Sequence, residues 1–252
     1  MTVFYFTSTG NCLYVAKRIG GSLYSIPQLM KEKTFVFKDD VIGLVYPCYG
    51  FGMPNIVRQF LTQVSWEAEY TFAIATYGNM TGAVLPNLEE FAKKQGKKFN
   101  YTNTLLMVDN YLPNYKVEDQ LAKLPGKMVE ENLARILADI NARKSNEPSA
   151  TFPEKLYTAL IQAGSRAFMN GKNAKSYLVN EDCTTCGICS KVCPTGNIEV
   201  RDKVYFKECC EACLGCVHLC PKNAIHLKNE KSSARFRNEH VTLKEIIEAN
   251  CQ

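Results

Sequence analysis

The chain has 252 residues, of which 46% are hydrophobic and 22% charged, and its formal net charge at pH 7 is +5. The apolar fraction is enough for a packed core, and no apolar run approaches the ~20 residues that cross a bilayer, so composition excludes a disordered chain and a membrane-spanning one. The chain opens directly on a strand-like run without a signal-peptide pattern, so we expect no Sec export. The mild charge comes with no nucleic-acid-binding motif, and we expect no nucleic-acid partner.

Short apolar strands alternate with amphipathic helices from residue 1 to about 142. The predicted strands are Val3–Phe6, Thr34–Phe37, Val41–Tyr46, Thr71–Thr76 and Asn103–Val108. The predicted helices are Asn11–Ile19, Asn55–Val64, Gly82–Lys94 and Val117–Asn141, the last broken or divided at Pro125-Gly126. This alternation predicts an α/β domain, a doubly wound parallel sheet of five strands with helices on both faces.

A loop rich in hydroxyl groups follows the first predicted strand and leads into a helix. It reads Thr7, Ser8, Thr9, Gly10, Asn11, Cys12. Backbone N–H groups at a helix N-terminus bind phosphate, and a glycine allows the ligand to approach closely. An ordinary N-cap is the alternative, but it needs only one such hydroxyl. The loop therefore predicts a phosphate site.

Polar, proline-containing breaks divide the rest of the chain. We expect a first domain over residues 1–144, a linker with an amphipathic helix over 145–175, a cysteine domain over 176–230, and an extension with a short helix over 231–252. The spacing from Thr242 to Glu245 is that of a capping box at the start of that last helix. We find no dinucleotide fingerprint and no Ser/His/Asp grouping, so we assign no catalytic residue.

The chain contains twelve cysteines, most of them in one cluster. A dense cluster behind a cysteine-poor front half indicates metal binding in a reducing compartment, which predicts a cytoplasmic protein. A shift of 27 residues superposes two copies of C-x₂-C-x₂-C-x₃-C-P, whose cysteines are Cys183, Cys186, Cys189 and Cys193, then Cys210, Cys213, Cys216 and Cys220. The cysteine domain is therefore a duplicated unit.

Three closely spaced thiolates followed by a fourth are typical of iron–sulfur cubes, where the fourth cysteine binds the other cluster. The expected ligand sets are Cys183, Cys186, Cys189 with Cys220, and Cys210, Cys213, Cys216 with Cys193. Zinc is the alternative, but structural zinc sites pair two ligands per loop. The spacing favours two [4Fe–4S] clusters. Cys209 is a bystander or substitute ligand, and His218 is expected to be a packing or surface residue.

The cysteine domain resembles the bacterial two-cluster ferredoxins, and Thr7–Asn11 is similar to the phosphate loop of flavodoxins. Cys12 departs from that pattern, since flavodoxins carry Ser or Thr there. Over nearly its full length the chain resembles the flavodoxin–ferredoxin fusion proteins of anaerobes. The resemblance implies a flavodoxin-like FMN domain, followed by a small α+β ferredoxin module that holds two [4Fe–4S] clusters.

The resemblance also implies where FMN would bind. Besides the phosphate loop, the flavin-binding loops of that family follow the third and fourth strands, here Pro47, Cys48, Tyr49, Gly50 and Thr76, Tyr77, Gly78, Asn79. Tyr49 and Tyr77 are the candidates to sandwich the ring, and Asp109–Tyr111 to close the rim. Cys48 is either a redox thiol or a packed small residue.

The combination predicts an electron-transfer iron–sulfur flavoprotein that converts one-electron and two-electron steps. The alternative is an FMN-dependent reductase of a quinone or nitro compound, fed by the clusters, so the sequence leaves open whether the chain is an enzyme. A redox sensor or assembly module is a third option. We expect a redox protein partner, a ferredoxin or an oxidoreductase. The oligomeric state stays open, a homodimer included.

Overall fold

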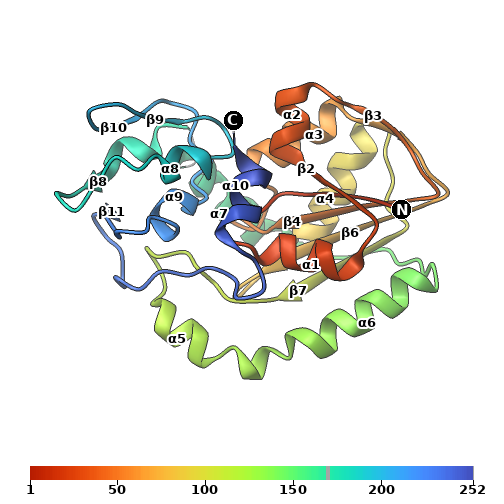
Figure 1. Ribbon diagram of the computed structural model, residues 1–252. Coiled ribbons are helices and arrows are strands. Elements are labelled where there is room, and N and C mark those ends of the chain that lie inside the picture. Colours follow the sequence, from red (N-terminus) through yellow and green to blue (C-terminus); the bar gives the residue numbers. More distant parts are fainter. Residues whose placement is uncertain (169–170, 252) are drawn as a thin grey trace.

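The structure, a computed structural model, describes residues 1–168 and 171–251. Its centre is a parallel sheet in the order β2-β1-β4-β6-β7 (Figure 1). The strands are β1 (Thr2–Tyr5), β2 (Ser22–Ser25), β4 (Val41–Pro47), β6 (Tyr70–Tyr77) and β7 (Tyr101–Leu106). Counted among themselves the strands run 2-1-3-4-5, which is the flavodoxin-like doubly wound order.

Helices cover both faces of the sheet because side chains alternate along each strand. Val3 and Tyr5 point into a core shared with α1 (Asn11–Ile19) and α6 (Val129–Asn141). Phe4 and Phe6 point to the opposite core, which is shared with α2 (Ile26–Glu32), α3 (Asn55–Gln63) and α4 (Val84–Lys94). The predicted α/β architecture is confirmed.

One predicted strand does not belong to the sheet. The run predicted over 34–37 forms β3 (Val36–Lys38), but it pairs with β5 (Ser65–Glu67) in a separate parallel ladder. Its place is taken by β2, which pairs with β1. Sequence reasoning missed β2 because the strand is short, carries serine at both ends, and lies exposed at the sheet edge.

The predicted break in the segment 117–141 is confirmed. The segment divides into α5 (Val117–Ala122), a 3₁₀ turn over Pro125–Lys127, and α6. Proline starts the turn because its fixed φ suits a first helical position but interrupts a helix interior.

The duplication of the cysteine domain extends beyond its cysteines. Shifting β8 (Tyr177–Val179), α8 (Ile188–Lys191) and β9 (Ile198–Val200) by 27 residues gives β10 (Val204–Phe206), α9 (Gly215–His218) and β11 (Ile225–Leu227). β8 pairs with β11 and β9 with β10, so each ladder contains one strand from each copy. Left-handed backbone recurs at the same places, at Thr185 and Ala212, Gly187 and Leu214, Gly196 and Asn223.

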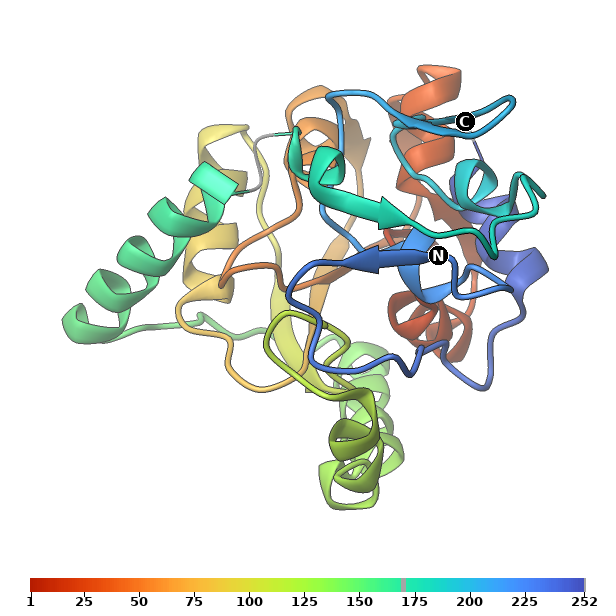
Figure 2. The same cartoon turned by 90° about the vertical axis from the view of Figure 1, so that its left-hand side faces the viewer.

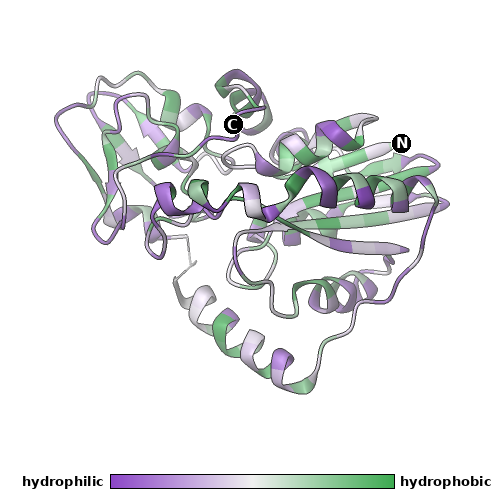
Figure 3. Ribbon diagram, turned by 90° about the horizontal axis from the view of Figure 1, so that it is seen from below, coloured by the Kyte–Doolittle hydropathy of each residue, from purple (hydrophilic) through white to green (hydrophobic). Residues whose placement is uncertain are grey.

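Two outer segments complete the molecule. α7 (Phe152–Phe168) lies beside α4 at the edge of the first domain (Figure 2). Several of its turns carry apolar residues (Figure 3). α10 (Leu243–Asn250) ends the chain against the first domain, contributing Ile246 and Ala249 to the core around α1. In the part of the chain that the structure describes, no helix is long and apolar enough to cross a membrane.

Candidate functional site

A cavity of about 530 Å³ lies at the carboxyl edge of the sheet, where doubly wound folds bind their ligands. The loops after β1, β4 and β6 meet there because parallel strands end at the same edge. The predicted FMN-binding residues that line it are Thr7, Ser8, Thr9, Asn11, Cys12, Pro47, Cys48, Tyr49, Gly50, Thr76, Tyr77, Gly78 and Asn79. Gly10 does not line the cavity. It lies behind the loop, where a β-carbon would meet Asn238 and Val241.

The loop after β1 provides no side-chain cap for the helix that follows it. α1 begins at Asn11 without a side-chain cap, so its first N–H groups face the cavity edge with the positive end of the helix dipole. Thr7 Oγ1 accepts from the N–H of Gly10 at 3.1 Å, which stabilises the loop itself. Thr9 Oγ1 accepts from the side-chain amide of Asn110. These residues fit a bound phosphate group.

The aromatic and thiol side chains that line the cavity differ in their hydrogen bonds and burial. Tyr49 donates from its hydroxyl to Ser8 Oγ at 3.3 Å, so this ring leans toward the phosphate loop. Burial raises the pKa of both Cys12 and Cys48 to about 12. Because a thiol becomes reactive as the thiolate, these settings favour packing roles for both cysteines.

A buried lysine that no sequence pattern singled out supports the loop after β6. The ammonium of Lys127 donates to the carbonyls of Gly78 (2.8 Å) and Met107 (2.6 Å) and to Gln120 Oε1 (3.2 Å). Burial lowers its pKa, and Asp109 opposes that shift. A β-carbon on Gly78 would come within 2.2 Å of the Asp109 side chain, so the close packing here requires glycine.

The segment predicted as a linker forms one wall of the same cavity. Tyr157, Ile161, Gly164 and Ser165 of α7 line it. Thr158 Oγ1 accepts from the N–H of Ala83 at 2.9 Å, and the side chain of Gln162 donates to the Phe51 carbonyl at 2.8 Å. Its amphipathic pattern predicted a helix, but nothing in the sequence indicated what that helix would cover.

The structure brings repeat cysteines of the two copies together. Cys183, Cys186, Cys189 and Cys220 line one small cavity. In the second copy, burial raises the pKa of Cys213 and Cys216. The charges of neighbouring cysteines, which include Cys193 and Cys210, raise it further. Thiols that raise one another's pKa lie close together, and a metal centre bound between them would hold them as thiolates.

Among the described residues, no three His, Cys, Asp or Glu side chains are placed to hold a single metal ion. The N–H groups of Asn197 and Ala224 donate to Cys193 (3.2 Å) and Cys220 (3.3 Å), which are equivalent positions of the repeat. Such bonds tune cluster potentials.

The two cysteine loops differ in their neighbours, and we name them accordingly. Residues 210–220 form the inner loop, since Ala212, Cys213 and Leu214 also line the cavity at the sheet edge. Residues 183–193 form the outer loop, where Cys186 is exposed. The sequence did not indicate that one copy would face the first domain and the other solvent.

Glu211 and His218 fasten the inner loop to the first domain. The carboxylate of Glu211 accepts from the N–H groups of Asn55 and Ile56 at the start of α3, and burial raises its pKa to about 7. His218 donates from Nε2 to the Asn110 carbonyl at 2.7 Å and accepts the Phe236 N–H at Nδ1. Burial lowers its pKa to about 4, so it is a neutral packing residue.

Cys209 lies apart from both groups. It is exposed, its N–H donates to Asn197 Oδ1 at 2.8 Å, and its thiol lies 3.5 Å from the Thr195 carbonyl. It lines neither the cavity at the sheet edge nor the cavity of the outer loop.

Comparison with solved structures finds flavodoxin-like proteins along the first domain. The general stress protein 14 of Treponema denticola, solved with FMN, covers 57% of this chain with 98% of its own length, at 11% identity and a TM-score of 0.37. The flavodoxin of Megasphaera elsdenii covers 41% of this chain and 85% of its own, at 16% identity and a TM-score of 0.29. Both scores are low, so the fold assignment rests on the strand order.

Comparison by sequence identifies the second domain. The 4Fe-4S dicluster domain family matches residues 158–239. The polyferredoxin of Methanothermus fervidus is 39% identical over 67 residues, and the chain spans only 15% of its length. Ferredoxin-1 of Chlorobaculum tepidum is 34% identical over 55 residues, which are 19% of this chain and 89% of that ferredoxin. Through its C-terminal domain the chain belongs to the family of 4Fe-4S dicluster ferredoxins, joined here to a flavodoxin-like domain.

Proposed function

We propose that this protein transfers electrons between two [4Fe–4S] clusters and an FMN, and so converts one-electron and two-electron redox steps. The observation that carries the proposal is the position of Cys213. This ligand of the inner cluster lies in the wall of the cavity that the three predicted flavin loops also line. A flavin in that cavity would be the immediate neighbour of the inner cluster.

The chain's own residues have separable tasks in this proposal. The N–H groups and hydroxyls of Thr7–Asn11 bind the phosphate, and Tyr49 and Tyr77 flank the ring. Lys127 holds the Gly78 carbonyl and thereby fixes the loop beside the ring. Bound there, FMN supplies a carrier for one or two electrons, whereas each cluster carries one.

The outer loop is the port for the redox partner. Cys186 and the neighbouring Thr184 and Thr185 are exposed, whereas the inner loop is buried against the first domain. A ferredoxin or an oxidoreductase can therefore approach the outer cluster most closely. The route runs from partner to outer cluster, inner cluster and FMN, or in reverse.

A reductase acting on a small aromatic acceptor is the second candidate. The cavity extends past the flavin loops to Tyr111 and Tyr115 and under Tyr157 of α7. Those side chains would give a quinone or nitro compound an aromatic wall. Saturable turnover of such a compound by the cluster-reduced protein would favour this candidate, and reoxidation only by a protein partner would favour the carrier.

The first test is cofactor content on anaerobically purified protein. We expect about eight irons, as many sulfides and one FMN per chain. Addition of a limiting amount of a one-electron donor should reduce clusters and flavin together. Eight irons without FMN, even after incubation with excess FMN, would contradict the proposal.

A further inference from the structure

The chain beyond the cluster domain returns to the phosphate loop. We define residues 235–251 as the C-terminal strap. We propose that this strap is part of the flavin site, because it holds the phosphate loop from behind and turns the backbone N–H of Ser8 toward the ligand. The inference rests on the proposed FMN site. It adds residues that lie outside the three loops predicted to bind FMN.

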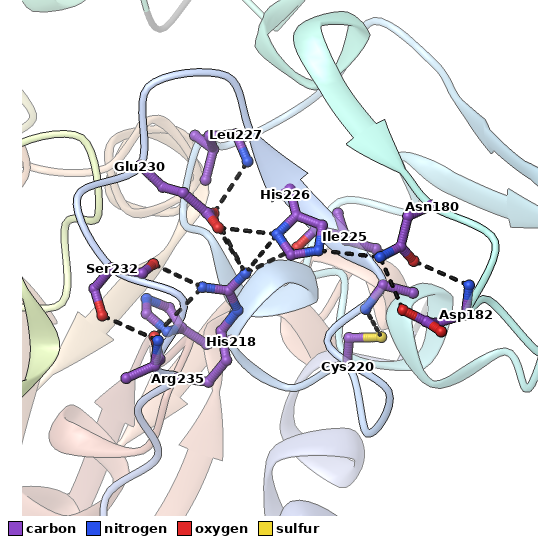
Figure 4. Close-up of polar contacts among 12 residues, drawn as sticks. Asn180, Asp182, His218, Cys220, Ile225, His226, Leu227, Glu230, Ser232 and Arg235 are labelled. Carbon is purple, nitrogen blue, oxygen red and sulfur yellow. Dashed lines mark hydrogen bonds and ion pairs between the residues drawn. The ribbon is translucent and has the colours of Figure 1, made fainter.

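The strap begins on a buried anchor in the cluster domain (Figure 4). The side chain of Arg235 is 7% exposed, and its guanidinium lies 3.1 Å from a carboxylate oxygen of Glu230. The same guanidinium donates to the Ser232 carbonyl at 3.1 Å. One residue later, the N–H of Phe236 donates to His218 Nδ1 at 3.1 Å. The strap therefore leaves the inner loop from a fixed position.

Two asparagines of the strap bind carbonyls of the phosphate loop. The N–H of Asn238 donates to the Thr9 carbonyl at 2.8 Å, and its side chain donates to Asn11 Oδ1 at 3.1 Å. The fully buried side chain of Asn250 donates to the Thr7 carbonyl at 3.0 Å. Alternate carbonyls of the loop are thus held on the side of the strap.

Peptide geometry converts this contact into ligand binding. In a planar trans peptide the C=O and the following N–H point in opposite directions. When Asn250 holds the Thr7 carbonyl, the N–H of Ser8 is turned away from the strap, and Ser8 lines the cavity. The strap therefore orients an N–H donor that a phosphate requires.

The strap also explains why Gly10 is glycine. Its φ of 105° is in the left-handed region, and a β-carbon there would lie 2.9 Å from Asn238 Cβ and 3.1 Å from Val241 Cβ. Further along, His240 stacks on Tyr14 with ring centroids 4.7 Å apart. The close approach of loop and strap is thus built into both segments.

The test compares FMN with riboflavin, which lacks the phosphate. Flavin-depleted protein with both clusters intact is titrated with each ligand by flavin fluorescence, for the parent, Asn250→Leu, Asn238→Ala and, as a control on the exposed face of α10, Lys244→Ala. We expect Asn250→Leu to weaken FMN binding at least about tenfold, since it leaves a buried carbonyl without its donor. We expect Asn238→Ala to weaken FMN binding severalfold, and riboflavin binding and the cluster spectrum to stay unchanged.

Each other outcome has a definite meaning. Unchanged FMN affinity in both asparagine variants would overturn the inference, and so would equal losses for FMN and riboflavin, which would indicate a general structural effect. If Asn250→Leu fails to fold, Asn238→Ala decides, because it removes the part-buried side-chain bond to Asn11 Oδ1 and keeps the backbone bond to the Thr9 carbonyl. If the parent protein binds no FMN, the proposed function itself fails before any variant is compared.

Discussion

The two cysteine loops have the same backbone in different surroundings. Both copies have the same cysteine spacing, a short helix at the same place and left-handed backbone at the same positions of the repeat. The residues between the ligands differ. Glu211 and His218 of the inner loop are buried against the first domain, and their counterparts Thr184 and Lys191 are exposed. Gly215, whose counterpart is Ile188, lies beside the Ser8 carbonyl of the first domain, which a β-carbon there would contact at 3.4 Å.

This comparison separates two requirements. Cluster binding needs the cysteines and the turns between them, which both copies keep. The place of a cluster in the electron route is set by the other residues of each loop. In the proposed electron route, the inner loop is the relay because it lines the cavity at the sheet edge, and the outer loop is the port because it does not.

Removal of equivalent ligands from the two loops should have the largest and most unequal effects. Cys213 and Cys186 occupy the same position of the repeat. The variants Cys213→Ala and Cys186→Ala should each lose the iron of the cluster that the replaced cysteine binds. Only Cys213→Ala should also lose FMN, because residues 212–214 line the cavity in which we propose that FMN binds. Iron, sulfide and flavin analysis measures both. Equal flavin loss in the two variants would break the distinction between relay and port.

Gly10→Leu should damage the flavin side and leave both loops intact. The new side chain would clash with Asn238 and Val241, so we expect FMN affinity to fall at least about a hundredfold with full iron content. Gly20→Ala is the matched control, because Gly20 also has a positive φ of 84° but no atom near its β-position. A Gly10→Leu protein that retains its flavin would refute the phosphate-loop assignment.

His218 and Lys191 occupy equivalent positions of the repeat, but His218 is buried against the first domain and Lys191 is exposed. The variants His218→Leu and Lys191→Leu therefore compare the two loops. His218→Leu leaves the buried Asn110 carbonyl and Phe236 N–H without partners, and should cost about 2 to 3 kcal/mol of unfolding free energy. Lys191→Leu should change it by less than about 0.5 kcal/mol. Anaerobic denaturant titration of the loaded proteins gives both values. Similar losses would mean that the inner loop is not specifically anchored.

Glu211 gives the smallest expected effect, a dependence on pH. Burial raises its pKa from 4.5 in the unfolded reference to about 7, so the folded protein prefers the protonated form. Its contribution to stability is therefore full below pH 4.5 and falls as the pH rises toward 7.

Glu211→Gln removes this ionisation while keeping an acceptor for the N–H groups of α3. Between pH 6 and 8 the parent should lose roughly 1 kcal/mol more stability than the variant. Thr184→Ala, at the equivalent exposed position, should follow the parent. Parallel pH profiles for the parent and Glu211→Gln would contradict the proposed titration.

Much of this organisation could be predicted from local sequence patterns. Alternating strands and helices predicted the α/β fold, and the cysteine spacing predicted the two groups of thiols. The loop Thr7–Asn11 was recognisable because its hydroxyls and glycine are contiguous. Each of these signals lies within a few residues of the element that it specifies.

The features that were missed depend on distant partners. Lys127 reads as a surface lysine in a turn, and only the fold places the Gly78 carbonyl beside it. The contact between Asn250 and Thr7 joins the two ends of the chain. The edge strand β2 carries too few apolar residues to be predicted from the sequence. Contacts of this kind are set by packing, which no local pattern records.

The most direct test of the relay is the rate at which a reduced two-cluster ferredoxin reduces the flavin. Anaerobic stopped-flow absorbance would compare the parent with Cys183→Ala/Cys186→Ala, after iron and flavin analysis has confirmed that only the outer cluster is lost. We expect flavin reduction to slow at least about tenfold in the variant, because the donor can no longer enter through the outer loop. An unchanged rate with FMN bound would mean that electrons reach the flavin without the outer cluster, and would contradict the route proposed.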